Sequence, residues 1–282
     1  MATGTGSTLR RRRLGTELRK LRESAALTIE EVGEHLDCSN AKISRLETGK
    51  VPVRRVDVDR MLDLYGCDDT EQREALLEIA RESKRKGWWI GYRDILPRPY
   101  PGLEAGASWI RNYETVLIPG LLQTEGYMRA LMQAPHIRMS DEERDRRVAA
   151  RLTRQQRLIE EDPPQLWVIL DEAVLRRVYG SPEVMREQLD WLLEVTKRPK
   201  IALQVLTYGS GPHPGTTGGF VLLDFPDPDH TPVVYTESMV GELYLEDPAE
   251  TAQHRRAYDH LQAAALSPQD SRQWIAERAR EL

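Results

Sequence analysis

Apolar residues recur three or four positions apart through the first 86 residues, and this spacing predicts a domain made only of helices. Leu14, Leu18 and Leu21 mark the first of them. Thr28 and Glu31 form an S/T-x-x-E capping box that opens the second. The five predicted helices cover about residues 14–22, 28–36, 39–49, 53–65 and 69–86. We therefore expect an N-terminal all-α domain of five helices over residues 1–86.

The pattern changes after this domain. Residues 87–102 hold two tryptophans and three prolines, which forbid a continuous helix and predict an aromatic, Pro-rich connector. Residues 103–282 mix both periodicities. Helices are predicted at Leu103–Tyr113, after Thr124, from Ser140, and at three Ser-Pro or Asp-Pro starts. Strands are predicted at about residues 166–170, 201–206, 219–225, 233–236 and 243–245. We expect an α+β C-terminal domain with a small mixed sheet.

The charge along the chain is uneven. The 282 residues carry a net charge of −5, yet residues 1–60 carry +4 and the remainder −9. A basic N-terminal region followed by an acidic remainder is expected when only one domain approaches phosphate. Two cysteines without metal-type spacing predict neither a disulfide framework nor a metal site, and no cofactor motif is present. We expect a cytoplasmic protein without a signal peptide or membrane span.

Residues 28–50 have the organisation of a helix-turn-helix, in which one helix enters the major groove and the preceding helix braces it. Four apolar residues form its buried side, and Gly33 is the small residue where the helices cross. We predict that base edges are contacted by Asn40, Ala41, Ser44 and Arg45. We predict that phosphates are contacted by Thr28, Ser39, Lys42 and Lys50. The run Arg10, Arg11, Arg12 and Arg13 is either a basic arm on DNA or a solvated basic tail.

The segment Ser44-Arg45-Leu46-Glu47-Thr48-Gly49-Lys50 resembles the "SRxExGK" signature of the Xre/Cro/C1 family of helix-turn-helix regulators. The resemblance covers about residues 14–66 and implies that Glu47 is structural and that the loop after Gly49 touches phosphate. The chain departs from the family at Ile29, where a glutamine often clamps a phosphate. The alternative to a DNA-binding domain is a small helical domain with charged faces.

The second region resembles a C-terminal domain common in actinobacterial Xre-type regulators. The resemblance rests on Trp109–Glu114, Ile118–Tyr127, Arg151…Arg154-Gln155, Asp171–Arg177, Met185…Gln188-Leu189 and Val234–Glu237. It implies pairing with a small partner protein and an antitoxin-like or regulatory role.

An enzyme with a DNA-targeting head is the third alternative, which we do not favour. Its evidence would be the carboxylates Asp171, Glu172, Glu237, Glu242 and Glu246 near predicted strand ends. Asp171-Glu172 is more simply a helix N-terminus that favours negative charge. The Gly-rich stretch 209–219 lacks the GK[ST] of a P-loop, and His213 within it has no evident fellow ligands. It is predicted to be a mobile loop, either a lid or a partner contact.

The sequence thus predicts a double-stranded DNA-binding transcription regulator, homodimeric because one helix-turn-helix contacts few base pairs. Its second domain would receive a small partner protein or a small-molecule effector. The alternative is an antitoxin-like module that neutralises a small partner and binds DNA only for autoregulation.

Overall fold

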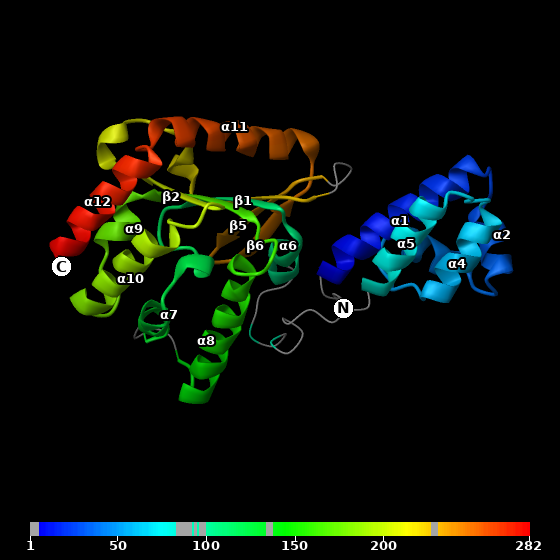
Figure 1. Ribbon diagram of the computed structural model, residues 1–282, viewed down its shortest axis with the longest axis horizontal. Helices are drawn as coiled ribbons and strands as arrows, with labels where there is room; N and C mark the ends of the chain where they lie inside the picture. The colour runs from blue at the N-terminus through cyan, green and yellow to red at the C-terminus, as the bar shows by residue number, and fades with distance from the viewer. Residues whose placement is uncertain (1–5, 83–91, 93–94, 96–99, 134–137, 227–230) are drawn as a thin grey trace. The chain divides into compact units, whose positions relative to one another are not determined.

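The computed structural model describes residues 6–82, 92, 95, 100–133, 138–226 and 231–282. The chain divides into two compact units, Met1–Gly106 and Ala107–Leu282, which are described separately (Figure 1). Most of the predicted connector, residues 87–102, lies outside the described residues. The short helix α6 (Tyr100–Gly106) belongs to the first unit.

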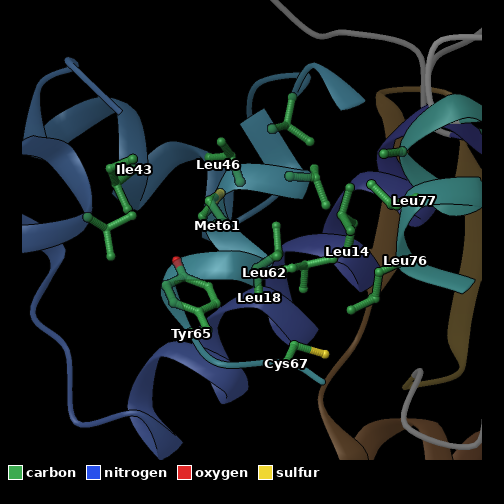
Figure 2. Packing of buried hydrophobic residues seen from close by; sticks show 14 residues of the cluster. Leu14, Leu18, Ile43, Leu46, Met61, Leu62, Tyr65, Cys67, Leu76 and Leu77 are labelled. Atoms are coloured by element: carbon green, nitrogen blue, oxygen red, sulfur yellow. The ribbon is translucent and has the colours of Figure 1, made fainter. Parts of the chain in front are cut away.

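The first unit contains the five predicted helices. They are α1 (Gly6–Ser24), α2 (Ile29–His35), α3 (Asn40–Glu47), α4 (Arg55–Leu64) and α5 (Thr70–Glu82). Each contributes one apolar stripe to a common core, because these helices repeat apolar residues at helical spacing. Figure 2 shows Leu14 and Leu18 of α1 and Leu62 of α4 within this core, with Ile43 of α3 in the same cluster. The predicted all-helical N-terminal domain is confirmed.

The second unit is built on a six-stranded mixed sheet. The strands are β1 (Trp109–Glu114), β2 (Gln165–Asp171), β3 (Ile201–Leu206), β4 (Phe220–Asp224), β5 (Val233–Ser238) and β6 (Gly241–Leu245). Their spatial order is β3-β2-β1-β4-β5-β6. The β1–β2 and β2–β3 pairs are parallel, whereas β4, β5 and β6 join antiparallel. The predicted α+β fold with a mixed sheet is confirmed.

One predicted helix is wrong. We expected Leu103–Tyr113 to form a single helix, but α6 ends at Gly106 and Trp109–Glu114 is the strand β1. This strand lies inside the sheet, with β2 on one side and β4 on the other. Trp109 and Tyr113 are four residues apart, which places them on one face of a strand as readily as on one face of a helix. Because Trp109–Glu114 pairs with β2 on one edge and with β4 on the other, it forms a strand rather than a helix.

Helices cover both faces of this sheet (Figure 1). They are α7 (Glu125–Met132), α8 (Asp141–Gln155), α9 (Glu172–Arg176), α10 (Pro182–Val195), α11 (Pro248–Ala264) and α12 (Pro268–Arg280). The three predicted Pro starts are confirmed, since Ser181, Asp247 and Ser267 each accept a backbone N–H of the helix that follows.

The face toward α11 is an apolar core. Tyr258 and Leu261 of α11 pack on Tyr113, Phe220 and other buried residues of the strands. The hydroxyl of Tyr258 donates to the carbonyl oxygen of Trp167 over 2.7 Å, which fixes α11 across β2. The opposite face, toward α7 and α8, carries polar residues where β1 and β5 end. Among the described residues, no helix has the length and apolar character needed to cross a membrane.

Candidate DNA-binding surface

The turn between α2 and α3 requires a glycine at position 33. A Cβ on Gly33 would lie 2.9 Å from both the Asn40 side-chain oxygen and the Cys38 carbonyl oxygen. Cβ atoms do not approach oxygen that closely, so the two helices meet at this distance only because Gly33 has no side chain. The predicted small residue at the crossing is confirmed.

The ends of the two helices are defined by their caps. The Thr28 hydroxyl accepts the Glu31 N–H, and the Glu31 carboxylate accepts the Thr28 N–H over 2.7 Å, which completes the predicted capping box. Ser39 occupies the N-cap position of α3 but makes no side-chain cap bond. Gly49 follows α3 with φ of 68°, the left-handed conformation that ends a helix without strain.

The exposed side of α3 presents the residues predicted to contact bases. Ile43 is fully buried and Leu46 is 3% exposed, whereas Asn40, Ala41, Ser44 and Arg45 are exposed. The Arg45 Nε donates to the Ala41 carbonyl oxygen over 3.0 Å, so this side chain lies along the exposed face. The helix therefore has a packed side and a free polar side, as a groove-binding helix requires.

The residues predicted to contact phosphate are all exposed, but Thr28 differs from the others. Its hydroxyl also donates to the Glu31 carboxylate over 2.9 Å. A negative charge thus already occupies the N-terminus of α2, where a phosphate would otherwise be favoured. A contact from Thr28 would have to displace Glu31, whereas Ser39, Lys42 and Lys50 stand free of that constraint.

A buried ion pair fixes the C-terminal end of α3. The Arg22 Nε donates to one oxygen of Glu47 over 2.7 Å, and its Nη2 donates to the other over 3.0 Å. The Arg22 Nη1 donates to the Leu27 carbonyl oxygen over 2.8 Å. The Arg22 and Glu47 side chains are 9% and 4% exposed. Glu47 is thus structural, as the resemblance implies, and it ties α3 to α1 and to the turn before α2.

A second contact holds α1 against the same end of α3. A Cβ on Gly15 would lie 2.4 Å from the Glu47 carbonyl oxygen and 2.6 Å from that of Leu46. Backbone atoms cannot rotate away as a side chain can. The two helices therefore approach closely because residue 15 is glycine.

Basic side chains surround α3. Arg54 makes a bidentate pair with Asp57, and this hydrogen bonding, with the charges of Lys42 and Arg60 nearby, lowers the pKa of Asp57. Arg60 donates to the carbonyl oxygen of His35 at the end of α2 over 2.7 Å. The anionic charge of Asp57 is thus compensated by Arg54, and the contacts of Lys42 and Lys50 with phosphate stay a prediction.

The run of four arginines lies within α1. Arg10, Arg11, Arg12 and Arg13 were predicted to precede the first helix as an arm or a tail, but α1 begins at Gly6. Arg11 is 7% exposed, which does not fit a solvated tail. The run extends the first helix because no residue within it interrupts helical geometry.

Of the carboxylates considered for catalysis, Asp171 and Glu172 have structural roles, whereas Glu237 and Glu242 face each other in the sheet. Asp171 caps α9 by accepting the Ala173 N–H, as the simpler interpretation predicts. Glu172 is buried, pairs with Arg176 and accepts the Tyr208 N–H over 2.9 Å. Both side chains therefore stabilise the folded structure. Glu237 and Glu242 lie directly opposite each other on β5 and β6.

The Gly-rich stretch 209–219 is docked at Gly215 rather than free along its length. A Cβ on Gly215 would lie 2.3 Å from the buried ring of Tyr113. The His213 ring stands 6.4 Å from the Tyr113 ring, centroid to centroid, and its Nδ1 accepts the Gly215 N–H. Among the described residues, no group of three His, Cys, Asp or Glu side chains is arranged to hold a metal ion.

Sequence reasoning missed the roles of Arg22 and Gly15. A signal existed for Arg22, because it follows Leu18 by four residues on the apolar stripe of α1, where a charged side chain must find a buried partner. Gly15 gave no comparable signal. Its role depends on contact with Leu46 and Glu47, which lie 31 and 32 residues further along the chain.

Comparison with protein families gives two matches. Residues 13–76 match the model of a helix-turn-helix domain, which covers part of α1, all of α2 to α4 and part of α5. Residues 98–277 match the model described as a domain of unknown function, DUF5753. Neither the curated proteins nor the solved structures contain a match to the chain. The chain therefore belongs to the DUF5753 family and carries at its N-terminus a helix-turn-helix domain, a DNA-binding fold.

Proposed function

We propose that this protein is a sequence-specific, dimeric transcription regulator of the Xre/Cro/C1 type, whose second unit receives a regulatory signal. The observation that carries the proposal is α3, whose apolar side is packed while Asn40, Ser44 and Arg45 are exposed. Arg45 would pair with guanine and Asn40 with adenine, the partners that their donor and acceptor groups match. Lys42 and Lys50 would contact the flanking phosphates.

The test begins by sequencing DNA fragments bound to the protein in cells. A dimer predicts an inverted repeat with half-site centres about one helical turn apart. Affinity for that site, and for random DNA of equal length, is then measured at one fixed salt concentration. We expect Arg45→Ala to cost about 1–3 kcal/mol on the specific site and to relax preference at one base pair. Arg81→Ala, at an exposed position on α5, is the control and should leave both affinities unchanged.

An equal loss on specific and random DNA would show that Arg45 contacts only the backbone. A bound site without an inverted repeat, together with a monomeric mass in solution, would refute the dimer. Lys50→Ala should differ from Arg45→Ala by weakening binding to both DNAs and reducing the salt dependence.

A second candidate function is capture of a small partner protein by the second unit, with DNA binding used for autoregulation as in an antitoxin. The hairpin between β5 and β6 favours this candidate. Met239 and Val240 at its tip are fully exposed, and Leu243 of the edge strand β6 is 53% exposed. Adjacent exposed apolar residues are typical of protein contacts. Co-purification of a small protein that Met239→Ser/Val240→Ser abolishes would support it, and unchanged capture would count against it.

We further propose that the second unit binds rather than catalyses. Two of the carboxylates considered for catalysis, Asp171 and Glu172, already act as a helix cap and an ion pair. If DNA regulation survives Ala substitution of Asp171, Glu237 and Glu242 in a folded protein, the enzyme alternative loses its support.

A further inference from the structure

The two edges of the six-stranded sheet differ in how they are covered. At the β3 edge, the Val205 N–H donates to the Ser271 hydroxyl over 2.9 Å, and the Val205 carbonyl oxygen accepts the Leu266 N–H over 2.9 Å. Ser271 is fully buried. The beginning of α12 and the residues before it therefore satisfy backbone groups of this edge strand, which is how folded proteins commonly protect a sheet edge.

The β6 edge has no comparable protection. β6 is the last strand in the order, and within the described residues it pairs with β5 alone. Its sequence, Gly-Glu-Leu-Tyr-Leu, contains neither the lysine nor the proline that commonly discourages pairing at an edge. Leu243 in its middle is 53% exposed. An edge strand with an exposed apolar side chain favours pairing with a strand of another chain.

The turn before β6 determines which backbone groups face the outer edge. Ser238 pairs with Gly241 across a two-residue turn, and the Ser238 hydroxyl donates to the Gly241 carbonyl oxygen over 3.0 Å. A two-residue turn closes on a hydrogen-bonded pair, and such pairs alternate along antiparallel strands. The odd-numbered residues of β6 therefore direct their backbone groups toward β5. Glu242 and Tyr244 direct theirs to the outer edge.

Only one register lets two copies of β6 pair across a two-fold axis without opposing like charges. Outward residues must face outward residues, so the axis passes at Glu242, Leu243 or Tyr244. An axis at Glu242 sets that carboxylate against itself, and an axis at Tyr244 sets Glu242 against Glu246. Like charges directly opposite are destabilising. An axis at Leu243 instead sets Glu242 against Tyr244 of the second copy, twice by symmetry.

The side chains of this register also match on both faces of the sheet. The two Leu243 residues form a non-hydrogen-bonded pair, in which side chains are closest, on the face where Leu245 packs against the core. On the other face, the Tyr244 hydroxyl donates to Glu242 of its own strand over 2.6 Å. A carboxylate accepts several hydrogen bonds, so a second phenol opposite Glu242 is compatible with this contact.

The hairpin tip lengthens the contact beyond the strand. In this register, positions 239 and 240 lie opposite positions 247 and 246 of the second copy, where its β6 ends and its α11 begins. Met239 and Val240 are fully exposed in one copy. Pairing would cover these two apolar side chains together with Leu243, which a single copy leaves in water.

We propose that β6 pairs with β6 of a second copy, antiparallel about a two-fold axis at Leu243, so that two six-stranded sheets become one. The inference rests on the dimer of the proposed function and names the surface that forms it. A small partner protein could add a strand at the same edge. The self-complementary charge pattern of β6 favours a second copy.

Cross-linking of the full chain tests the register. Cys38, the partly exposed native cysteine, is first replaced by serine, whereas Cys67 is buried. Leu243→Cys should then give a disulfide-linked dimer on mild oxidation, because the paired Cα atoms lie about 4.5 Å apart, within the range of a disulfide. Met239→Cys is the control. It is more exposed than Leu243, but its two copies would lie about 26 Å apart along the paired strands.

Sedimentation of the full chain without DNA measures the assembly itself. We expect a dimer, and Leu243→Lys should weaken it at least tenfold by setting two ammonium groups opposite each other at the axis. Val116→Lys is the matched control, because Val116 is 52% exposed and follows β1, three strands away from β6. Near-ultraviolet circular dichroism confirms that each variant is folded.

A dimer in which Met239→Cys cross-links as fast as Leu243→Cys would overturn the β6 interface and leave the dimeric regulator standing. So would a dimer that Leu243→Lys weakens no more than Val116→Lys. A monomeric chain would overturn the interface and the dimer together, while DNA binding is measured separately. A monomeric chain that holds a small protein until Leu243→Lys releases it would overturn the second copy as the occupant of this edge.

Discussion

Replacement of Glu47 by glutamine tests the buried pair that positions α3. The change keeps the shape of the side chain but removes the charge and one of the two acceptors that Arg22 uses. Arg22 would remain 9% exposed, with the Leu27 carbonyl oxygen as its unchanged acceptor. Breaking a buried ion pair on one side costs about 3–5 kcal/mol. The retained amide oxygen places Glu47→Gln near the lower end, at about 3 kcal/mol.

Hydrogen exchange of the α3 amides in the full chain measures this cost locally. Because each 1.4 kcal/mol is about a tenfold change, 3 kcal/mol predicts exchange about a hundredfold faster. Glu78→Gln is the matched control, since Glu78 pairs with Arg81 on the exposed side of α5 and such pairs contribute under about 1 kcal/mol. Replacing both partners, as Arg22→Met/Glu47→Leu, should cost less than Glu47→Gln alone. If Glu47→Gln changes exchange no more than the control does, the pair does not hold α3.

Three further predictions concern other contacts. Gly15→Ala should destabilise the first unit by about 1–3 kcal/mol, because its Cβ would meet backbone oxygens of Leu46 and Glu47, whereas Gly209→Ala, with no atom nearer than 3.8 Å, should be close to neutral in thermal unfolding. Gly215→Ala should loosen the loop over Tyr113, seen as increased proteolytic cleavage within residues 209–219. Burial, with a smaller contribution from Glu237, raises the pKa of Glu114 from 4.5 to about 7 despite the Asn112 hydrogen bond. The folded state then binds this proton more tightly than the unfolded state, so stability falls as pH rises from 4.5 through 7. Glu114→Gln should therefore raise the thermal midpoint at pH 8 and change it little at pH 4.5, and an equal effect at both pH values would refute the shift.

The sequence predicted the first unit well because its information is local. Helical spacing, the Thr28–Glu31 box and the glycines at 33 and 49 each specify structure within a few residues. The helix-turn-helix could therefore be located before its packing was known. The buried pair of Arg22 with Glu47 could be suspected only from an arginine on an apolar stripe.

The second unit was predicted less completely, for a physical reason. Strand β1 was mistaken for part of a helix because the same spacing of aromatic residues suits both structures. The position of β6 at the edge of the sheet could not be predicted at all. It exists only through the pairing of strands that come together from distant parts of the chain, and no local pattern encodes that pairing.

The central position of β1 also determines when this sheet can form during synthesis. Its partner β4 follows it by more than one hundred residues, and β2 by about fifty. A nascent chain therefore carries β1 with one edge unpaired until β4 has left the ribosome, whereas the helices of the first unit need only their near neighbours. Unpaired edges invite association between chains, so slow or interrupted translation after residue 171 would expose this protein to aggregation while its DNA-binding domain is already folded.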